Sequence, residues 1–316
     1  MKLKTKNKIK ENITGYLLIL PLLISLIFFT LYPLLLALFQ SFFKDLELLR
    51  YPNYDWSNFG IDNYIHAFKD PAFWKSLRLT LVYAIISVPL SMTLSFIVSY
   101  FLSKDFKGAR VYRVLYYLPC LIPGIAGAII YRYIYSGDPQ GFLNSLFEHS
   151  FLGKLFPNFP YQYFDNNLEA VSMISFISMS LFSVGASSPF WIAGFKSIPK
   201  SYYEAASLDG IGRTRTFFKV TIPMMSKYIF YQAVVGFIGA FQIGQGVLQF
   251  SQTAGNGNLH FLGLLIYNVS QHENNFGYAS ALSYILFILI AGFSVLLFKS
   301  NRFVYYEGGF LHRYSG

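Results

Sequence analysis

The stretch YYEAASLDGIGRTRTFFKVTIPMM, residues 202–225, is a polar and basic segment between two strongly apolar runs. The runs are Ala170–Phe195 before it and Tyr228–Phe250 after it, and neither contains Lys, Arg, Asp or Glu. A helix needs about 20 predominantly apolar residues to cross the hydrocarbon core of a bilayer. We therefore expect two membrane-spanning helices joined by a polar loop.

The rest of the chain repeats this pattern. Of its 316 residues, 54% are hydrophobic and only 13% are charged, whereas a soluble domain has about 25% charged residues. Four more uncharged apolar runs occur: Tyr16–Phe43, Leu79–Ser103, Val114–Tyr131 and Asn274–Phe298. The sequence thus predicts an all-α polytopic membrane protein with six transmembrane helices.

The N-terminal tail MKLKTKNKIKEN is basic and precedes the first apolar run, an arrangement that a signal peptide also has. A signal peptide has an apolar core of about 7–15 residues followed by a small-residue cleavage site. The run Tyr16–Phe43 is much longer and lacks such a site. We expect it to be a retained transmembrane helix.

The basic residues predict the orientation. Most of the Lys and Arg lie in segments 1–15, 104–113, 196–227 and 299–316, and the loop 251–278 has none. Loops rich in Lys and Arg stay in the cytoplasm. We therefore predict cytoplasmic termini and three parts: a basic tail (1–15), a six-span membrane domain (16–298) with a cytoplasmic loop (196–226), and a C-terminal tail (299–316). Confinement of the charge to loops argues against nucleic-acid binding.

Several kinds of chemistry have no motif here. The sequence has no G-x-x-x-x-G-K-[ST] phosphate-binding loop, one cysteine (Cys120), and five His without metal-ligand spacing. Ion-coupled transporters usually carry ionisable residues within the membrane, and none of the six runs contains a carboxylate. We expect no metal, no cofactor and no catalysis in this chain, with transport energy coming from another subunit.

Within the cytoplasmic loop, the residues predict two short helices. Pro199 precedes good helix formers, and Asp209 with Gly210 is suited to a left-handed helix end. Glu204, Ala205 and Ala206 are expected to form a flat surface that fits a groove on a partner. The alternative is an amphipathic loop lying on anionic lipid.

This loop closely resembles the Glu-Ala-Ala loop of permease subunits of binding-protein-dependent ABC importers. That signature has Glu-Ala-Ala, then Gly, then an aliphatic residue and Pro before the next span. Its positions here are Glu204, Ala205, Ala206, Gly210, Ile222 and Pro223, with Asp209 beside the glycine. The stretches PFWIAGFKSIPKSYYEAASLDG and FGIDNYIHAFKDPAFWKSLRLTLVYA resemble the carbohydrate-uptake branch, in particular short maltose F-type, glycerol-phosphate and multiple-sugar permeases.

The resemblance implies the type I importer permease fold in a bacterial plasma membrane. It also implies the partners: a second six-span permease, an extracellular solute-binding protein, and two cytoplasmic ATPases that bind ATP and Mg²⁺. The loop 196–226 would be docked on one ATPase. The extra N-terminal spans and large periplasmic insertion of the enterobacterial maltose subunit are not present.

A sugar path needs amides, hydroxyls and aromatic rings. Gln242, Gln245 and Gln249 are spaced by three and four residues, which places them on one face of a helix. Further candidates are Tyr131, Ser178 and Tyr284. The alternative is that these side chains make interhelical hydrogen bonds within the bundle.

The leading hypothesis is a subunit of an ATP-driven sugar importer. The same role for a polyol, glycerol phosphate or an acidic oligosaccharide is the nearest alternative. A stand-alone ion-coupled carrier would transport without ATPases, and a membrane scaffold or sensor would show no uptake defect when deleted.

Overall fold

The computed structural model describes residues 16–44, 46–47, 54–122, 124–150, 169–244 and 258–299. In these ranges all regular structure is helical, and extended backbone pairs at an isolated bridge between Phe43 and Phe59. The predicted N-terminal tail (1–15) lies outside the described residues, as does the predicted C-terminal tail (299–316) apart from Lys299. The chain divides into two compact units, one from residues 1–70 and 266–285 and the other from residues 71–265 and 286–316.

The first unit contains the helical segment Tyr16–Gln40, of which Leu26–Leu31 is a π-helix (η1) and Tyr32–Gln40 is α2. It continues with the short helices η2 (Trp56–Asn58) and α3 (Asp62–Lys69) and includes parts of α15 (Leu262–Gln271) and α16 (Phe276–Lys299).

Two polar side chains fix the turn that follows α2. The buried Asn63 amide on α3 donates to the carbonyl oxygens of Ser41 at 3.0 Å and Phe43 at 2.9 Å. Asp55 caps η2 by accepting from the Ser57 backbone N–H at 3.0 Å. That hydrogen bond holds the pKa of the Asp55 carboxyl below its usual value.

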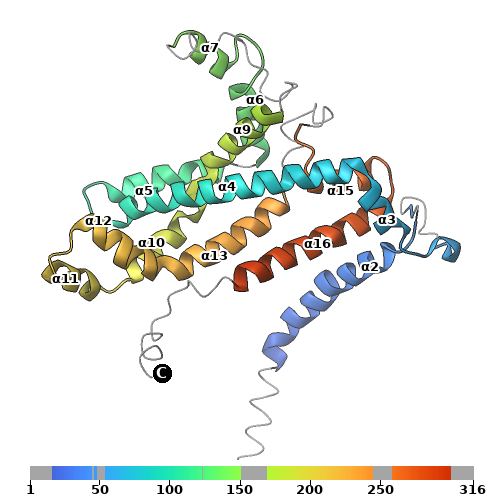
Figure 1. Cartoon of the computed structure of the whole chain (residues 1–316), viewed down its shortest axis with the longest axis horizontal. Coiled ribbons are helices and arrows are strands. Elements are labelled where there is room, and N and C mark those ends of the chain that lie inside the picture. The colour runs from blue at the N-terminus through green and yellow to red at the C-terminus, as the bar shows by residue number, and fades with distance from the viewer. Residues whose placement is uncertain are drawn as a thin grey trace, which may run out of the picture. The chain divides into compact units, whose positions relative to one another are not determined.

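The second unit is built around α4 (Pro71–Ser103), a helix of 33 residues. Figure 1 shows α4 running the length of this unit beside α5 and α13. The other helices, in chain order, are α5 (Ala109–Tyr117), η3 (Leu118–Leu121), α6 (Gly124–Ile134), α7 (Phe142–Glu148), α9 (Glu169–Ser180), η4 (Leu181–Ser187), α10 (Ser188–Ser197), α11 (Lys200–Leu208), α12 (Arg213–Thr216), η5 (Phe217–Thr221) and α13 (Ile222–Phe241).

Small polar residues bring α4 close to η4 and α10. The Ser95 hydroxyl donates to the Val184 carbonyl at 2.9 Å, and the Ser99 hydroxyl donates to Ser188 at 2.6 Å. In lipid, helices gain little from hydrophobic association, so small residues and interhelical hydrogen bonds hold them together. Toward the end of α10, Trp191 and Met225 form a buried aromatic and aliphatic cluster.

The third predicted span is not one continuous helix. The run Val114–Tyr131 is divided among α5, η3 and α6. Its two prolines explain the break: Pro119 lies in η3, and Ile122, which precedes Pro123, is extended with ψ of 123°. Proline lacks a backbone N–H and disfavours helical geometry in the residue before it.

Five helices among the described residues are long and apolar enough to cross a membrane: Tyr16–Gln40, Pro71–Ser103, Glu169–Ser197, Arg213–Phe241 and Phe276–Lys299. The prediction of six crossings and the prediction of cytoplasmic termini remain predictions.

The second short helix predicted in the loop 196–226 does not stand apart from the following helix. Helix is continuous from Arg213 to Phe241 and passes through the π-helix η5 before Pro223. The π-helix η1 likewise lies just before Pro33. A proline ring clashes with the carbonyl four residues earlier, so a wider turn at that point lets the helix continue.

Candidate functional site

The loop 196–226 forms a compact helical cap at one end of the second unit. In Figure 1, α11 and α12 lie together beside the start of α13 and the end of α10. The predicted start of the first loop helix is confirmed, since Pro199 has extended geometry and α11 begins at Lys200. The Tyr203 hydroxyl lies 3.2 Å from the Thr221 hydroxyl, which ties α11 to η5.

The end of α11 confirms the predicted role of Gly210, whose φ is +69°. The Ile211 N–H donates to the Ala206 carbonyl at 2.9 Å, and the Gly210 N–H donates to Ser207 at 3.1 Å. These two bonds define a Schellman motif, which satisfies carbonyls left open at a helix end. Asp209 is the C-cap residue. The direction in which the chain leaves α11 is therefore fixed by the backbone.

The expected flat Glu-Ala-Ala surface is only partly present. Glu204 and Ala205 are exposed, but Ala206 retains only 3% of its exposure. Ala206 lies three residues after Tyr203, on the face of α11 that the Tyr203–Thr221 contact ties to η5. The exposed apolar residue is instead Leu208, at 89%.

A shallow depression runs along α11. It is lined by Lys200, Tyr203, Glu204, Ser207 and Leu208. These residues offer one anionic, one cationic and two apolar contacts on a short rigid helix. Ile222 and Pro223, at the first two positions of α13, are half-buried and lie outside this depression.

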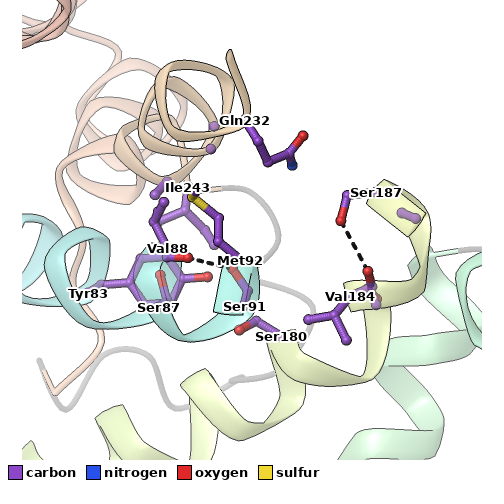
Figure 2. A pocket seen from close by; sticks show the side chains of 15 residues that line it. Tyr83, Ser87, Val88, Ser91, Met92, Ser180, Val184, Ser187, Gln232 and Ile243 are labelled. Carbon is purple, nitrogen blue, oxygen red and sulfur yellow. Dashed lines mark hydrogen bonds between the residues drawn. The ribbon is translucent and has the colours of Figure 1, made fainter. Parts of the chain in front are cut away.

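A second feature of this unit is a cavity of about 260 Å³ between α4, η4 and α13. Figure 2 shows the Gln232 amide extending from α13, while Tyr83, Ser87, Ser91 and Met92 come from α4. Among the described residues, the lining consists of Tyr83, Ser87, Val88, Ser91, Met92, Ser180, Ser183, Val184, Ala186, Ser187, Gln232, Gly236, Gly239, Ala240 and Ile243.

The chemistry of this cavity is polar and uncharged. Ser91 donates to the Val88 carbonyl at 3.0 Å and Ser187 to the Val184 carbonyl at 3.2 Å (Figure 2). A hydroxyl that donates to backbone keeps lone pairs that can accept from a ligand hydroxyl. None of the described residues that line it is Lys, Arg, Asp, Glu or His. The cavity is thus suited to a neutral hydroxylated molecule.

The residues predicted for a substrate path lie elsewhere. Ser178 is bonded to the Tyr135 hydroxyl at 2.6 Å, and Tyr131 packs on Phe182 with ring centroids 5.4 Å apart. In the first unit, the Tyr284 hydroxyl donates to the Leu34 carbonyl. These three contacts are of the interhelical kind that was the alternative at the sequence level.

The predicted glutamine stripe is not seen as a helical face. Helix α13 ends at Phe241, and Gln242 is its exposed C-cap residue. Gly244 explains the end, because a Cβ there would lie 2.5 Å from the backbone of Gly263 and the chain must pass close to α15. Gln245 and Gln249 lie outside the described residues.

Sequence reasoning missed the polar cavity residues of α4 and α13, although a signal was present on α4. Tyr83, Ser87, Ser91, Ser95 and Ser99 recur every fourth residue of α4 and form one polar stripe on its face. The first three line the cavity, and the last two bond to η4 and α10. Gln232 lies nine residues after Pro223, and no motif in the sequence indicated that it would line a cavity.

Comparison with known proteins decides the family. A family model described as "Binding-protein-dependent transport system inner membrane component" matches residues 64–302. The chain belongs to this family. It is therefore a non-catalytic, multi-pass component of a bacterial inner membrane, as the sequence predicted.

Curated relatives match over nearly the whole chain. The "Probable ABC transporter permease protein YesP" of Bacillus subtilis (strain 168) is 33% identical, with 96% of each chain covered. The "Lactose transport system permease protein LacF" of Rhizobium radiobacter is 27% identical, covering 92% of this chain and 95% of the relative. The "Multiple sugar-binding transport system permease protein MsmF" of Streptococcus mutans is 28% identical, covering 94% and 98%.

A solved structure also matches. It is a bacterial ABC transporter "involved in the import of the acidic polysaccharide alginate", with a TM-score of 0.78 and 16% sequence identity. The match covers 95% of this chain and 98% of that chain. At this identity the likeness shows the fold alone, and the fold is the type I importer permease fold predicted from the sequence.

Proposed function

We propose that this permease subunit forms half of the translocation path of an ATP-driven importer of neutral mono- or oligosaccharides. The observation that carries the proposal is the uncharged, hydroxyl- and amide-lined cavity between α4, η4 and α13. Sugars present many hydroxyls, and a buried site that pairs with them rejects ligands that cannot do so. The names of LacF and MsmF, as transport permeases for lactose and multiple sugars, support the same class of cargo.

Energy would enter through α11. Its exposed Glu204 and Leu208 lie on a helix whose end is fixed by hydrogen bonds, so displacement of α11 would be passed to α13 through the Tyr203–Thr221 contact. We infer that one of two cytoplasmic ATPases docks here, that a second six-span permease completes the path, and that an extracellular solute-binding protein delivers the sugar.

A second cargo class is an acidic one, such as an acidic oligosaccharide or glycerol phosphate, and the alginate importer of like fold favours it. An anionic cargo in a buried site needs a cationic partner, because an unpaired buried charge is strongly disfavoured. Among the described residues that line the cavity there is no Lys, Arg or His, which favours neutral sugars over this class.

The test is uptake by the complete system in proteoliposomes. The chain is reconstituted with its cognate binding protein, second permease and ATPases, and labelled lactose, maltose and glycerol 3-phosphate are offered with and without ATP. ATP-dependent uptake of a neutral sugar is expected, insensitive to a proton ionophore. Uptake of glycerol 3-phosphate alone would show that the cargo is acidic and not a neutral sugar. Ionophore-sensitive uptake without ATP would indicate an ion-coupled carrier.

A further inference from the structure

An apolar groove lies on the outer side of α4, away from the polar stripe that lines the sugar cavity. Its walls are Val82, Ile86 and Leu90 on α4, and Met173, Ile174 and Ile177 on α9. Several of these side chains are open to the surroundings, and Ile174 is 67% exposed. Both helices belong to candidate membrane spans, so the groove lies at the depth of the bilayer.

One end of the groove is polar. Glu169 lies at this end, and Arg78 donates two hydrogen bonds to its carboxylate, at 2.6 and 2.9 Å. Lys75, one turn before Arg78, has an exposed side chain. Because residues three and four apart share a helix face, Lys75 and Arg78 continue the stripe of Val82, Ile86 and Leu90. Among the described residues, two cations and one anion leave this end net positive.

The length of the groove matches one leaflet. From Arg78 to Leu90 the rise along α4 is about 18 Å at 1.5 Å per residue. One leaflet contributes about half of the ~30 Å hydrocarbon core. Leu79 is the first residue of the uncharged run, so Arg78 falls at headgroup level and Leu90 near the bilayer centre.

We propose that this groove is a binding site for one anionic phospholipid, with an acyl chain between α4 and α9 and its phosphate at Lys75 and Arg78. An anionic headgroup suits the net positive end, because Lys and Arg side chains near the membrane surface attract anionic lipid headgroups. A bound lipid would fill the space between two core helices and fix their separation.

Photo-crosslinking tests this site directly. The full-length chain is placed in nanodiscs containing phosphatidylglycerol with a diazirine on its acyl chain, and crosslinked peptides are identified by mass spectrometry. Crosslinks are expected in residues 82–90 and 170–181. Ile86→Trp should reduce them about tenfold, which corresponds to about 1.4 kcal/mol, whereas Ile85→Trp on the adjacent, exposed position of α4 should not.

Two further variants keep the test decisive. Ile174→Trp fills the groove from a side chain that is mostly exposed, so it should reduce crosslinking without loss of folding. Lys75→Gln should weaken crosslinking by phosphatidylglycerol but not by a matched phosphatidylcholine probe. If Ile85→Trp, Ile86→Trp and Ile174→Trp are crosslinked equally, the lipid site is wrong. It is also wrong if Ile174→Cys forms a disulfide with a cysteine of the second permease in the assembled complex, because the groove is then covered by that subunit. Equal weakening of both probes by Lys75→Gln overturns the headgroup assignment.

Discussion

The Ile211 backbone N–H donates to the Ala206 carbonyl at 2.9 Å, and the chain between them turns through Gly210 at a φ of +69°. This contact closes α11 and sets the direction of the segment that leads to α12. An ideal Cβ on Gly210 would meet nothing within 4 Å. The requirement for glycine here is therefore conformational and not steric.

The first prediction concerns this turn. Gly210→Val should strain the left-handed geometry by about 1–2 kcal/mol, because a β-branched side chain disfavours positive φ. Gly210→Asn should be tolerated better, since Asn adopts this region more readily. The expected result for Gly210→Val is loss of the ATPase from the purified complex, with the chain still folded by size-exclusion chromatography.

Gly212 supplies the matched control. It lies two residues further on, with no atom within 4 Å of an added Cβ, but its φ is −63°, which any residue adopts. Gly212→Ala should retain the ATPase and ligand-stimulated hydrolysis. If Gly210→Val behaves like Gly212→Ala, the Schellman turn is not needed for coupling.

The second prediction concerns the charge on α11. Glu204→Lys should weaken ATPase docking, because it reverses the anionic charge in the shallow depression of α11. Uptake should fall severalfold while the permease pair stays assembled. Glu148→Lys, the same reversal at an exposed position of α7, is the control and should leave uptake unchanged. Wild-type uptake in Glu204→Lys would favour a simple membrane-surface loop.

Local signals made much of this loop predictable. Pro199, Asp209 and Gly210 act through their own backbone preferences, so their positions mark the start and end of α11 without tertiary information. The burial of Ala206 was not predictable, because it depends on tertiary packing of α11. The division of Val114–Tyr131 was marked by Pro119 and Pro123, but apolar composition alone suggested a span.

The cavity was harder to predict from the sequence than the loop was. Its polar residues come from α4, η4 and α13, and which faces of three uncharged runs meet depends on helix packing. Gln242 was chosen for its spacing to Gln245, a spacing that has meaning only if the helix continues. The close approach of Gly244 to Gly263 ends α13 at Phe241, and no local sequence signal predicts that contact.

The third prediction separates the two glutamines. Gln232 lines the cavity, so Gln232→Leu should remove a hydrogen bond to the sugar and weaken uptake by the equivalent of about 1–3 kcal/mol. Gln242→Leu alters an exposed C-cap residue and should have a smaller effect. The concentration dependence of uptake measures both. A larger loss for Gln242→Leu would move the path away from the cavity.

The fourth prediction concerns Gly185 in η4. A Cβ there would collide with the Tyr116 carbonyl oxygen, which is backbone and cannot move aside as a side chain can. Gly185→Ala should force α5 and η3 away from η4 and reduce the yield of folded chain. Gly292→Ala, with nothing within 4 Å, should be neutral or slightly stabilising, because Ala favours helix by up to about 1 kcal/mol. Fluorescence-detected size-exclusion chromatography compares them, and equal yields would mean that η4 tolerates the shift.

The last prediction concerns orientation, which follows from the basic segments and not from packing. Gln271 is exposed at the end of α15, in the segment 251–278 that has no Lys or Arg, and Arg213 is exposed at the start of α12. Since Lys and Arg are retained on the cytoplasmic side, Gln271 should face outward and Arg213 inward. In a Cys120→Ala background, an impermeant thiol reagent should label Gln271→Cys in intact cells and Arg213→Cys only after permeabilisation. Labelling of Arg213→Cys in intact cells, with Gln271→Cys protected until permeabilisation, would invert the topology and place α11 on the wrong side of the membrane for an ATPase.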